Sequence, residues 1–328
     1  MSHGITAWDV AKLAGVSQSS VSRVFFGGAA VSEKTRKKVL AAAEELGYVP
    51  NEFARSLITN KTRVIGLVMK GVHNPFYPQV LKEFTTHFKE MGYSILFVHT
   101  NNDEIQKGDI EMLLHYNVAG VIITDATLSL KVIEDFKKSQ IPLVLFNRKV
   151  EGQNFFSVGT NNIEASRRIA EHLIQKGCTD MVYVAGAQNT STSIEREKGF
   201  SEILKKHKLP YKVYHSNYSY DGGYHTAKRI VQDGTIPSAF FVANDIMAFG
   251  VLDALREQSI AVPSQTKVIG FDNIEMAAWP IYNLTTWEQP ISQMVKETVK
   301  YIISEIEEYT DRIGNIEIEG ELIKRKTT

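Results

Sequence analysis

Short apolar runs alternate with amphipathic stretches along the chain from residue 63 onward. Each run is five or six residues long, as buried strands are, whereas the stretches between them repeat apolar residues at helical spacing. The predicted strands are 64–69, 94–99, 120–124, 142–147, 181–186, 211–215, 239–244 and 267–271, and the main predicted helices are 80–91, 165–176, 194–206, 223–232 and 247–257. Continuous apolar strands separated by helices indicate parallel sheets covered on both faces. This pattern predicts an α/β core of two doubly wound parallel-sheet lobes, with a ligand cleft beyond the carboxyl ends of the strands.

The first fifty residues have a different pattern, typical of short helices. Thr6 can cap a helix that begins after it, with Asp9 three residues later in the position of a capping box. Gly15 follows where the helix should end, a position at which left-handed backbone favours glycine. The expected apolar stripe of this helix consists of Val10, Leu13 and Ala14.

A second helix is predicted directly after a tight turn, with Ser17 as its cap. Its exposed face carries side chains that can bond base edges or phosphates, namely Gln18, Ser19, Ser22 and Arg23. The two helices therefore predict a helix-turn-helix, with Gln18 at the end of the recognition helix that enters a major groove. The alternative is a helical hairpin that packs on another part of the protein; it is disfavoured because turn, caps and polar face all agree.

A third helix is predicted from Glu33 to Tyr48, with Ser32 as its cap and lysines near its start. Its expected apolar face consists of Val39, Leu40, Ala43 and Leu46. The sequences DVAKLAGVSQSSVSRV, VSEKTRKKV and YVPNEFARSL occur in this order within the first 57 residues. Together they resemble the headpiece and hinge of the LacI/GalR family of bacterial transcriptional regulators, a far more specific match than one short motif.

The resemblance implies that residues 51–58 form a hinge that becomes helical on operator DNA. Two hinges, one from each subunit of a homodimer, would enter the minor groove of a pseudo-palindromic operator, where Leu57 acts as a wedge beside Ala54. Read alone, FARSLI is equally an ordinary helix end. The predicted DNA-binding residues are Thr6, Ser17, Gln18, Ser19, Ser22, Arg23, Ser32, Lys34, Thr35, Asn51, Ala54, Arg55 and Leu57.

The resemblance also implies a domain organisation. Residues 1–50 would form the all-α headpiece, residues 51–62 the hinge, and residues 63–328 a periplasmic-binding-protein-like core. One lobe of that core would take about 63–160 plus 290–318, and the other about 161–288 plus 319–328. The ending IEGELIKRKTT resembles the last strand of the family. No leucine-heptad tail follows it, so we expect a dimer rather than a tetramer.

One departure from the family lies after the recognition helix, where Phe25 and Phe26 stand in place of a usual polar residue. We expect one of them to pack into the headpiece core. An exposed Phe26 would remove a phosphate contact. By resemblance, Gln18 and Ser19 occupy the positions that select the operator.

Composition fits a soluble intracellular regulator, and the family resemblance implies a bacterial cytoplasmic, nucleoid-associated one. The chain has 328 residues with 43% hydrophobic content, and we find neither a segment of transmembrane length nor a signal peptide. Its single cysteine, Cys178, is consistent with a reducing compartment and is expected in the core. Net charge is zero, yet residues 1–62 hold eight Lys/Arg against five Asp/Glu. A basic end on a slightly acidic body suits phosphate binding by that end.

Polar and aromatic side chains gather at the predicted strand ends. The predicted ligand-binding residues are His73, Asn74, Phe76, Asn147, Arg148, Arg196, Tyr218, Asn244, Asp272 and Gln289. Carboxylate, amide and guanidinium groups can chelate adjacent hydroxyls, while Phe76 and Tyr218 can stack on a sugar ring. The positions resemble those of ribose-binding proteins and their repressor relatives, except that Asn147 stands where those relatives usually carry aspartate. An amide can donate as well as accept, so we expect a small sugar or sugar derivative whose hydroxyl pattern, oxidation state or charge differs from that of ribose.

Some of these residues have simpler alternatives. Asp272 and Asn244 can each cap the helix that follows, and Arg196 can pair with Glu195 or Glu197 on a solvated helix face.

Other classes of protein are also possible. An enzyme is disfavoured because G-x-S-x-G, P-loop and G-x-G-x-x-G motifs are lacking. The histidine spacing predicts no metal site, and we expect no cofactor. The leading helix-turn-helix disfavours an extracytoplasmic sugar-binding protein. Within the family, a purine- or nucleoside-responsive regulator and a phosphocarrier-protein-dependent regulator stay open.

Overall fold

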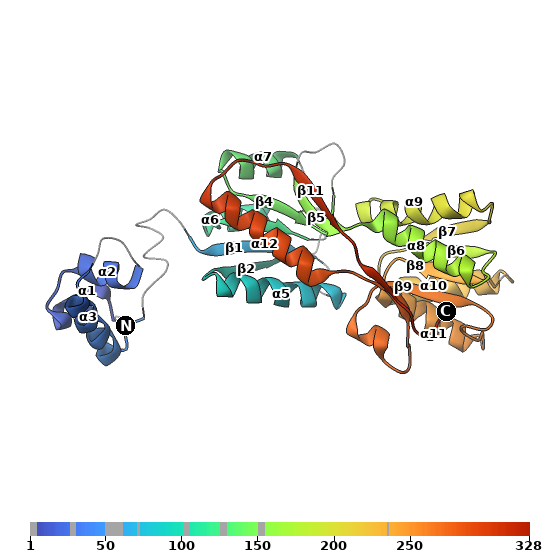
Figure 1. Ribbon diagram of the computed structural model, residues 1–328, viewed down its shortest axis with the longest axis horizontal. Helices are drawn as coiled ribbons and strands as arrows, with labels where there is room; N and C mark the ends of the chain where they lie inside the picture. The colour runs from blue at the N-terminus through green and yellow to red at the C-terminus, as the bar shows by residue number, and fades with distance from the viewer. Residues whose placement is uncertain are drawn as a thin grey trace. The chain divides into compact units, whose positions relative to one another are not determined.

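The computed structural model describes residues 5–26, 31–49, 62–70, 73–100, 105, 107–124, 130–149, 155–234 and 236–328. The chain divides into two compact units, Met1–Thr62 and Arg63–Thr328 (Figure 1). We describe each unit by itself.

The first unit contains α1 (Ala7–Ala14), α2 (Gln18–Phe26) and α3 (Glu33–Leu46). Thr6 is the N-cap of α1, and the Asp9 carboxylate accepts hydrogen bonds from its backbone N–H at 2.9 Å and its hydroxyl at 2.7 Å. Gly15 ends α1 with a φ of 65°. The Ser32 hydroxyl accepts from the Thr35 N–H at 3.2 Å and so caps α3. The caps predicted from the sequence are thus confirmed.

The core of this unit is built from small and β-branched side chains. Its buried members are Val10, Ala11, Ala14, Val21, Val24, Val39, Ala42 and Ala43. Phe25 packs against this cluster and meets Tyr48 edge-on, with ring centroids 5.7 Å apart, as expected for one of the two phenylalanines. The assignments of Leu13 and Leu40 to apolar faces were wrong: the side chains are 46% and 44% exposed. The small side chains bring the helices close together, so the core is already filled without them.

Among the described residues of the second unit, six strands form one wholly parallel sheet in the order β11-β5-β4-β3-β1-β2. The strands are β1 (Val64–Met69), β2 (Ser94–His99), β3 (Gly120–Ile123), β4 (Leu143–Phe146), β5 (Phe156–Thr160) and β11 (Gly314–Ile318). The helices of this lobe are α5 (Phe76–Glu90), α6 (Lys107–His115), α7 (Leu130–Lys138) and α12 (Ile291–Glu307). α12 packs on the sheet and against α5 (Figure 1).

A second sheet of six described strands has the order β12-β10-β9-β8-β6-β7 and is parallel except for the β12–β10 pair. The strands are β6 (Met181–Ala185), β7 (Tyr211–His215), β8 (Ala239–Val242), β9 (Lys267–Asp272), β10 (Thr285–Glu288) and β12 (Glu321–Ile323). The helices are α8 (Asn162–Gln175), α9 (Ser191–Lys206), α10 (Tyr220–Gln232), α11 (Asp245–Glu257) and the short η1 (Glu275–Ala278).

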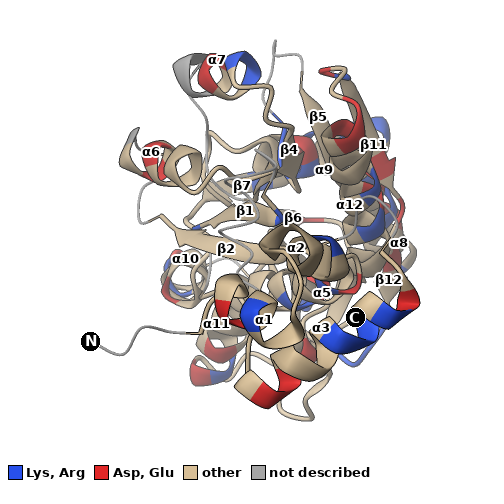
Figure 2. Cartoon of the chain, turned by 90° about the vertical axis from the view of Figure 1, so that its left-hand side faces the viewer, with Lys and Arg blue, Asp and Glu red and all other residues tan. Residues whose placement is uncertain are grey.

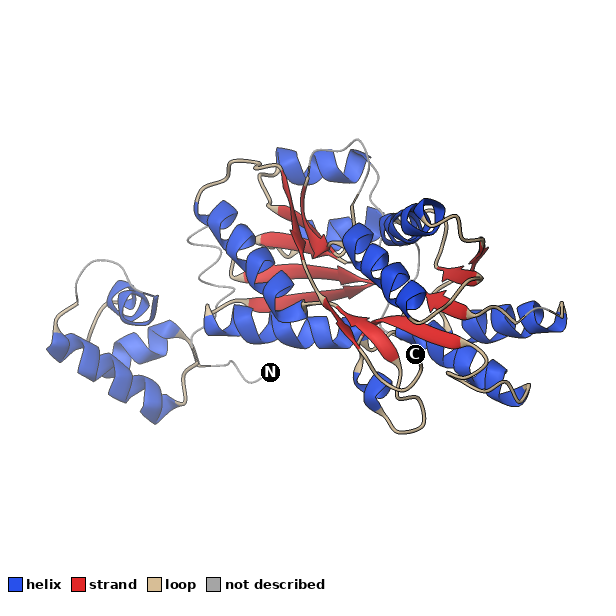
Figure 3. Cartoon of the chain, turned by 45° about the vertical axis from the view of Figure 1, so that its right-hand side comes forward, coloured by secondary structure: helices blue, strands red, loops and turns tan. Residues whose placement is uncertain are grey.

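In both lobes the strands (red) lie inside a covering of helices (blue), as Figure 3 shows. Central strands such as β3, β6 and β8 are buried along their whole length, which explains why they read as continuous apolar runs. The predicted fold class, a helical headpiece with two doubly wound α/β lobes, is confirmed. None of the described helices has the length and apolar composition that crossing a membrane requires.

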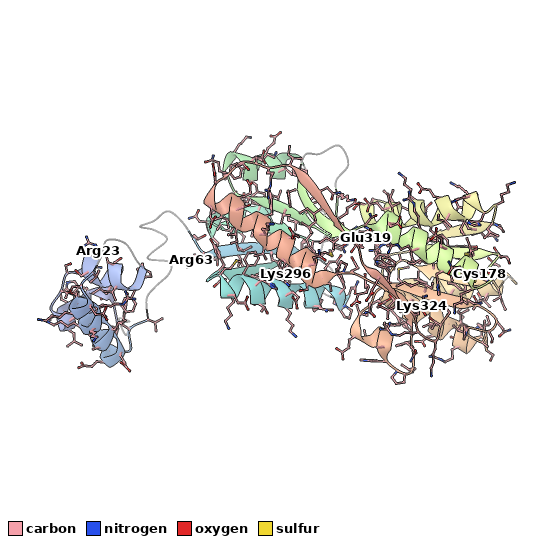
Figure 4. All side chains as sticks on the ribbon, in the orientation of Figure 1. Arg23, Arg63, Cys178, Lys296, Glu319 and Lys324 are labelled. Atoms are coloured by element: carbon pink, nitrogen blue, oxygen red, sulfur yellow. The ribbon has the colours of Figure 1, made fainter. Side chains whose placement is uncertain are left out.

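Within residues 155–328 the chain passes between the two sheets at three points: from β5 to α8, from β10 to α12, and from β11 to β12. Glu319, labelled in Figure 4, lies on the last of these crossovers. Because the crossovers follow strand ends, they run past the edge at which the carboxyl ends of both sheets lie. This arrangement concentrates polar side chains from distant parts of the sequence in one place.

Candidate functional site

Asp272, the last residue of β9, lies at the centre of a buried polar cluster that joins both lobes. Its carboxylate accepts a hydrogen bond from Asn74 Nδ2 at 3.2 Å and another from Gln289 Nε2 at 2.6 Å. Asn74 belongs to the first lobe, and Gln289 to the crossover after β10. Gln289 Oε1 in turn accepts from the Thr160 hydroxyl at 2.9 Å. Three of the predicted residues are thus brought together at one carboxylate.

The environment of this carboxylate disfavours its charge. Burial raises the pKa of Asp272 to about 6, against the opposing effects of the Arg196 guanidinium and of the hydrogen bonds from Asn74 and Gln289. Behind it lies Asp245, which is fully buried and accepts hydrogen bonds from the Thr286 hydroxyl at 2.6 Å and the Ile274 N–H at 2.9 Å. Burial and the neighbouring Asp272 raise the pKa of Asp245 well above its usual range.

Asp272 also has an unusual backbone, with a φ of 124°. Such a conformation is costly for a residue with a Cβ and must be held by its surroundings. The carboxylate bonds two side chains rather than a helix N–H among the described residues, so the capping alternative is wrong. Strained, buried polar groups of this kind are typical of binding sites.

Arg196, on α9, is only 2% exposed, so the alternative of a solvated helix face is wrong. Its Nε donates to Asn162 Oδ1 at 2.9 Å, and its Nη1 donates to the Ala243 carbonyl. The guanidinium carbon lies 3.5 Å from the centroid of the Phe271 ring. Stacking and two fixed hydrogen bonds hold the guanidinium in one orientation, as recognition by an arginine requires.

Tyr218 lies between β7 and α10 with a φ of 61°. Its hydroxyl is 2.9 Å from the Thr190 hydroxyl and 3.0 Å from the Thr192 hydroxyl. Arg148, from the first lobe, donates to the same Thr192 hydroxyl at 3.2 Å. The ring lies directly on Gly186, where an added Cβ would come 1.9 Å from the ring carbon Cζ. Only glycine leaves room for the tyrosine at this point.

Asn147 follows β4 and is buried, with a φ of 57°. Its backbone N–H donates to the Val158 carbonyl at 2.7 Å, whereas its side-chain Oδ1 has no hydrogen-bond partner among the described residues. A buried acceptor without a partner costs free energy, which a bound donor would recover.

Three predicted residues differ from their expected roles. Phe76 is 1% exposed and packs in the hydrophobic core edge-on to Tyr77, so its expected role of stacking on a ligand was wrong for this structure. Asn244 Oδ1 accepts from the Met247 N–H at 2.9 Å and caps α11, which confirms the capping alternative. His73 is exposed, whereas the described side chains that bond Asp272 are those of Asn74 and Gln289.

Several residues of the cluster were missed by sequence reasoning, namely Thr160, Asn162, Thr190 and Thr192. All stand at a crossover or at the start of α9. The one available signal was the run TSTS at 190–193, whose hydroxyls precede the helix that carries Arg196.

In the first unit, the polar face predicted for α2 is accessible. Gln18, Ser19 and Arg23 are exposed and Ser22 is half-buried (Arg23 is labelled in Figure 4). The Ser17 hydroxyl accepts from the Ser20 N–H at 3.2 Å and so caps α2. Lys34 is exposed near the start of α3, whose basic residues are blue in Figure 2. The predicted hinge residues Asn51, Ala54, Arg55 and Leu57 lie outside the described residues.

Comparisons with known proteins agree with the helix-turn-helix of the first unit and with the two-lobed core. Residues 6–51 match the family model of bacterial regulatory proteins of the lacI family, and residues 170–328 match the periplasmic binding protein-like domain. The HTH-type transcriptional repressor PurR of Pasteurella multocida is 31% identical, with 98% of each chain covered. The chain belongs to the LacI family of bacterial regulatory proteins. It is therefore a DNA-binding transcriptional regulator and not an enzyme.

Other members of the LacI family agree over the whole length. The ribose operon repressor of Halalkalibacterium halodurans is 28% identical, with 98% of this chain and 97% of the relative covered. The lac repressor dimer bound to operator and the anti-inducer ONPF matches with a TM-score of 0.89 at 26% identity, covering 99% of both chains. The complex of the regulator CelR with cellobiose matches with a TM-score of 0.74 at 25% identity, covering 99% of this chain and 100% of the other.

Proposed function

We propose that this LacI-family regulator is a repressor whose affinity for its operator is set by a small sugar or sugar derivative bound between the two core lobes. The observation that carries the proposal is the buried Asp272 carboxylate. It accepts hydrogen bonds from Asn74 of one lobe and from Gln289 of a crossover, and so connects the two. A vicinal pair of sugar hydroxyls would donate to this carboxylate in place of the two amides. Binding would thereby change the contacts between the lobes.

The surrounding groups suit a polyhydroxylated ligand. Arg196 offers fixed donors, Asn147 offers a buried acceptor without a partner, and Tyr218 offers an aromatic face beside Arg148. Relatives that are named ribose repressor, or were solved with cellobiose, lend the sugar class further support. A ligand that favours one arrangement of the lobes would change operator affinity about 5–150-fold, for a coupling of about 1–3 kcal/mol.

A purine effector is the second candidate. Several relatives carry the name PurR, at 31% and 32% identity for two of them. The Asn147 amide favours it as well, because an amide can both donate to and accept from the edge of a purine, whereas an aspartate only accepts when ionised.

The test is the melting temperature of the full chain against pentoses, hexoses, sugar acids, sugar phosphates and purine bases. A ligand at a hundredfold its Kd adds about 2.7 kcal/mol to the free energy of unfolding. We expect one class to raise the melting temperature, with the effect lost in Asp272→Ala and kept in Asp233→Ala, which removes an exposed carboxylate. If no compound shifts the melt, the small-molecule proposal fails and a protein co-regulator takes its place.

We further propose that the protein acts as a homodimer on a pseudo-palindromic operator and is nucleoid-associated. Gln18, Ser19 and Arg23 of α2 would read the operator.

The second lobe exposes Trp279 and Ile281, which are 46% and 61% accessible. Ile281 borders a cavity of about 330 Å³ that is also lined by Leu252 and Tyr282. Such an apolar surface is suited to being covered by a second subunit.

A further inference from the structure

A continuous chain of hydrogen bonds connects Lys149 of the first lobe to Arg196 of the second. Lys149 Nζ lies 2.7 Å from Glu195 Oε1 and also forms an ion pair with Glu317 of β11. The other oxygen of Glu195 accepts from Asn162 Nδ2 at 2.9 Å. Asn162 Oδ1 accepts from Arg196 Nε at 2.9 Å. Each member of the chain therefore fixes the orientation of the next.

The chain becomes more buried toward the cleft. The side chains of Lys149 and Glu195 are 27% and 17% exposed, whereas Asn162 and Arg196 are buried. Burial lowers the pKa of Lys149, but pairing with Glu195 and Glu317 outweighs it and leaves the pKa raised. Solvent and salt screen such a half-buried ion pair less than they screen a pair on the open surface.

The segment that follows β4, which contains Arg148 and Lys149, makes two further contacts with the first turn of α9. The Lys149 N–H donates to the Ser191 hydroxyl at 3.0 Å, and Arg148 donates to the Thr192 hydroxyl at 3.2 Å. The end of β4 in one lobe is thus joined to the start of α9 in the other. By contrast, the ion pair of Arg167 with Glu202, at 2.6 Å, joins α8 and α9 within the second lobe.

We propose that Asn162 and Glu195 are positioning residues for Arg196, and that the Lys149–Glu195 ion pair is the latch that couples this positioning to closure of the lobes. When the lobes separate, Glu195 loses its charged partner and Asn162 loses its fixed neighbour, so Arg196 is no longer held. Closure and the orientation of the cleft arginine become a single event. The proposal rests on the proposed function in so far as Arg196 binds the effector.

The first experiment needs no ligand. In full-length protein labelled with nitrogen-15 arginine, the Arg196 Nε–H signal is assigned by its loss in Arg196→Lys, and its exchange with water is measured. We expect exchange to rise about threefold to tenfold in Lys149→Met and in Glu195→Gln. Lys149→Arg, which keeps the charge, and Arg167→Met, which breaks the ion pair within one lobe, should leave it unchanged. Unchanged exchange in both Lys149→Met and Glu195→Gln, or an equal rise in Arg167→Met, would overturn the proposal.

A second experiment connects the latch to binding and separates two possible failures. D-ribose and, in parallel, hypoxanthine are titrated into the wild type, Asn162→Ala, Lys149→Met and Arg167→Met. We expect the probe that binds the wild type to bind more weakly to Asn162→Ala and to Lys149→Met but equally to Arg167→Met; equal affinity for all four proteins would overturn the coupling. If neither probe binds the wild type, these two effectors are excluded, while the exchange of Arg196 still decides the latch.

Discussion

Asp272 shows how one residue can combine strain, burial and charge. Its backbone lies at positive φ, its carboxylate is buried, and a second buried acid lies behind it. Each of these features costs stability, and together they keep a carboxylate at the point where the lobes meet. Proteins tolerate such costs at functional sites, because the rest of the fold holds the residue in place.

The first prediction concerns the dependence of stability on pH. The pKa of Asp272, about 6 in the folded protein, lies above the usual 3.8, so the folded state binds more protons between about pH 4 and pH 6. The free energy of unfolding therefore falls as pH rises through this window. Asp272→Asn lacks the titrating carboxyl and therefore this loss of stability. The melting temperature of the variant minus that of the wild type should thus be larger at pH 7.5 than at pH 5. A difference in melting temperature that stays constant from pH 5 to pH 7.5 would contradict this assignment.

The second prediction uses the contact between Gly186 and Tyr218. In Gly186→Ala the new methyl group would overlap the tyrosine ring, which must then move and lose its bonds to Thr190 and Thr192. We expect a loss of about 1–3 kcal/mol in the free energy of unfolding, together with weaker effector binding. Gly108→Ala is the matched control, because a Cβ there meets open space. Chemical denaturation of both variants measures the difference.

Not all site residues could be predicted from the sequence. Strand ends pointed to Asp272, Asn74 and Gln289, because topology brings the carboxyl ends of parallel strands together. A buried hydroxyl such as that of Thr160 leaves no comparable signal, since threonine is common on surfaces as well. Phe76 was misjudged because an aromatic side chain beside a cleft is equally suited to fill the core.

At the scale of elements, the eight predicted strands of the core are all present, with ends that differ by one or two residues at most. Four described strands were not among these eight. The apolar pattern missed β11 and β12 because GNIEI and ELI are short and mix polar with apolar residues, and β5 and β10 because FSVGT and TTWE contain polar residues. In the structure these residues are buried with partners: Ser157 donates to Asn315, and Thr286 donates to Asp245. The apolar pattern identifies a strand only where the strand buries apolar side chains alone.

The third prediction belongs to α2. Arg23→Ala should weaken binding to all DNA sequences and reduce the salt dependence of binding, because an exposed arginine that contacts phosphate releases counterions. Gln18→Ala should instead lose about 1–3 kcal/mol of discrimination at one base pair. Both are measured by fluorescence anisotropy on an operator selected from random DNA. Lys176→Ala, a basic residue of the core, is the control, and unchanged affinity of Arg23→Ala would refute the role of α2.

At the scale of the whole molecule, family membership and the two-sheet core follow from patterns that extend over the entire chain. The chemistry of the effector does not follow from such patterns, because it depends on a few side chains whose neighbours come from distant parts of the sequence. The exposed apolar residues of the second lobe could not be distinguished from core residues by pattern either. Trp279 and Ile281 have the composition of a core but lie on the surface.

The fourth prediction tests the proposed subunit interface. Ile281→Asp places a charge on the exposed apolar surface beside Tyr282 and should convert the dimer into monomers at micromolar concentration. Sedimentation velocity measures the change, and operator affinity should fall with it. Ile236→Asp, at another exposed isoleucine of the same lobe, should remain dimeric. A dimeric Ile281→Asp would place the interface elsewhere.

The three crossovers also determine the order in which the molecule can be completed during synthesis. α1, α2 and α3 of the first unit lie at the start of the chain and can leave the ribosome together. Neither lobe can be completed early, because α12, β11 and β12 all follow residue 290 in the sequence. A nascent chain that stops before residue 314 lacks one edge strand of each sheet, β11 in the first and β12 in the second. Translation therefore delivers a DNA-binding unit first and the effector-sensing core, both lobes at once, only at the end.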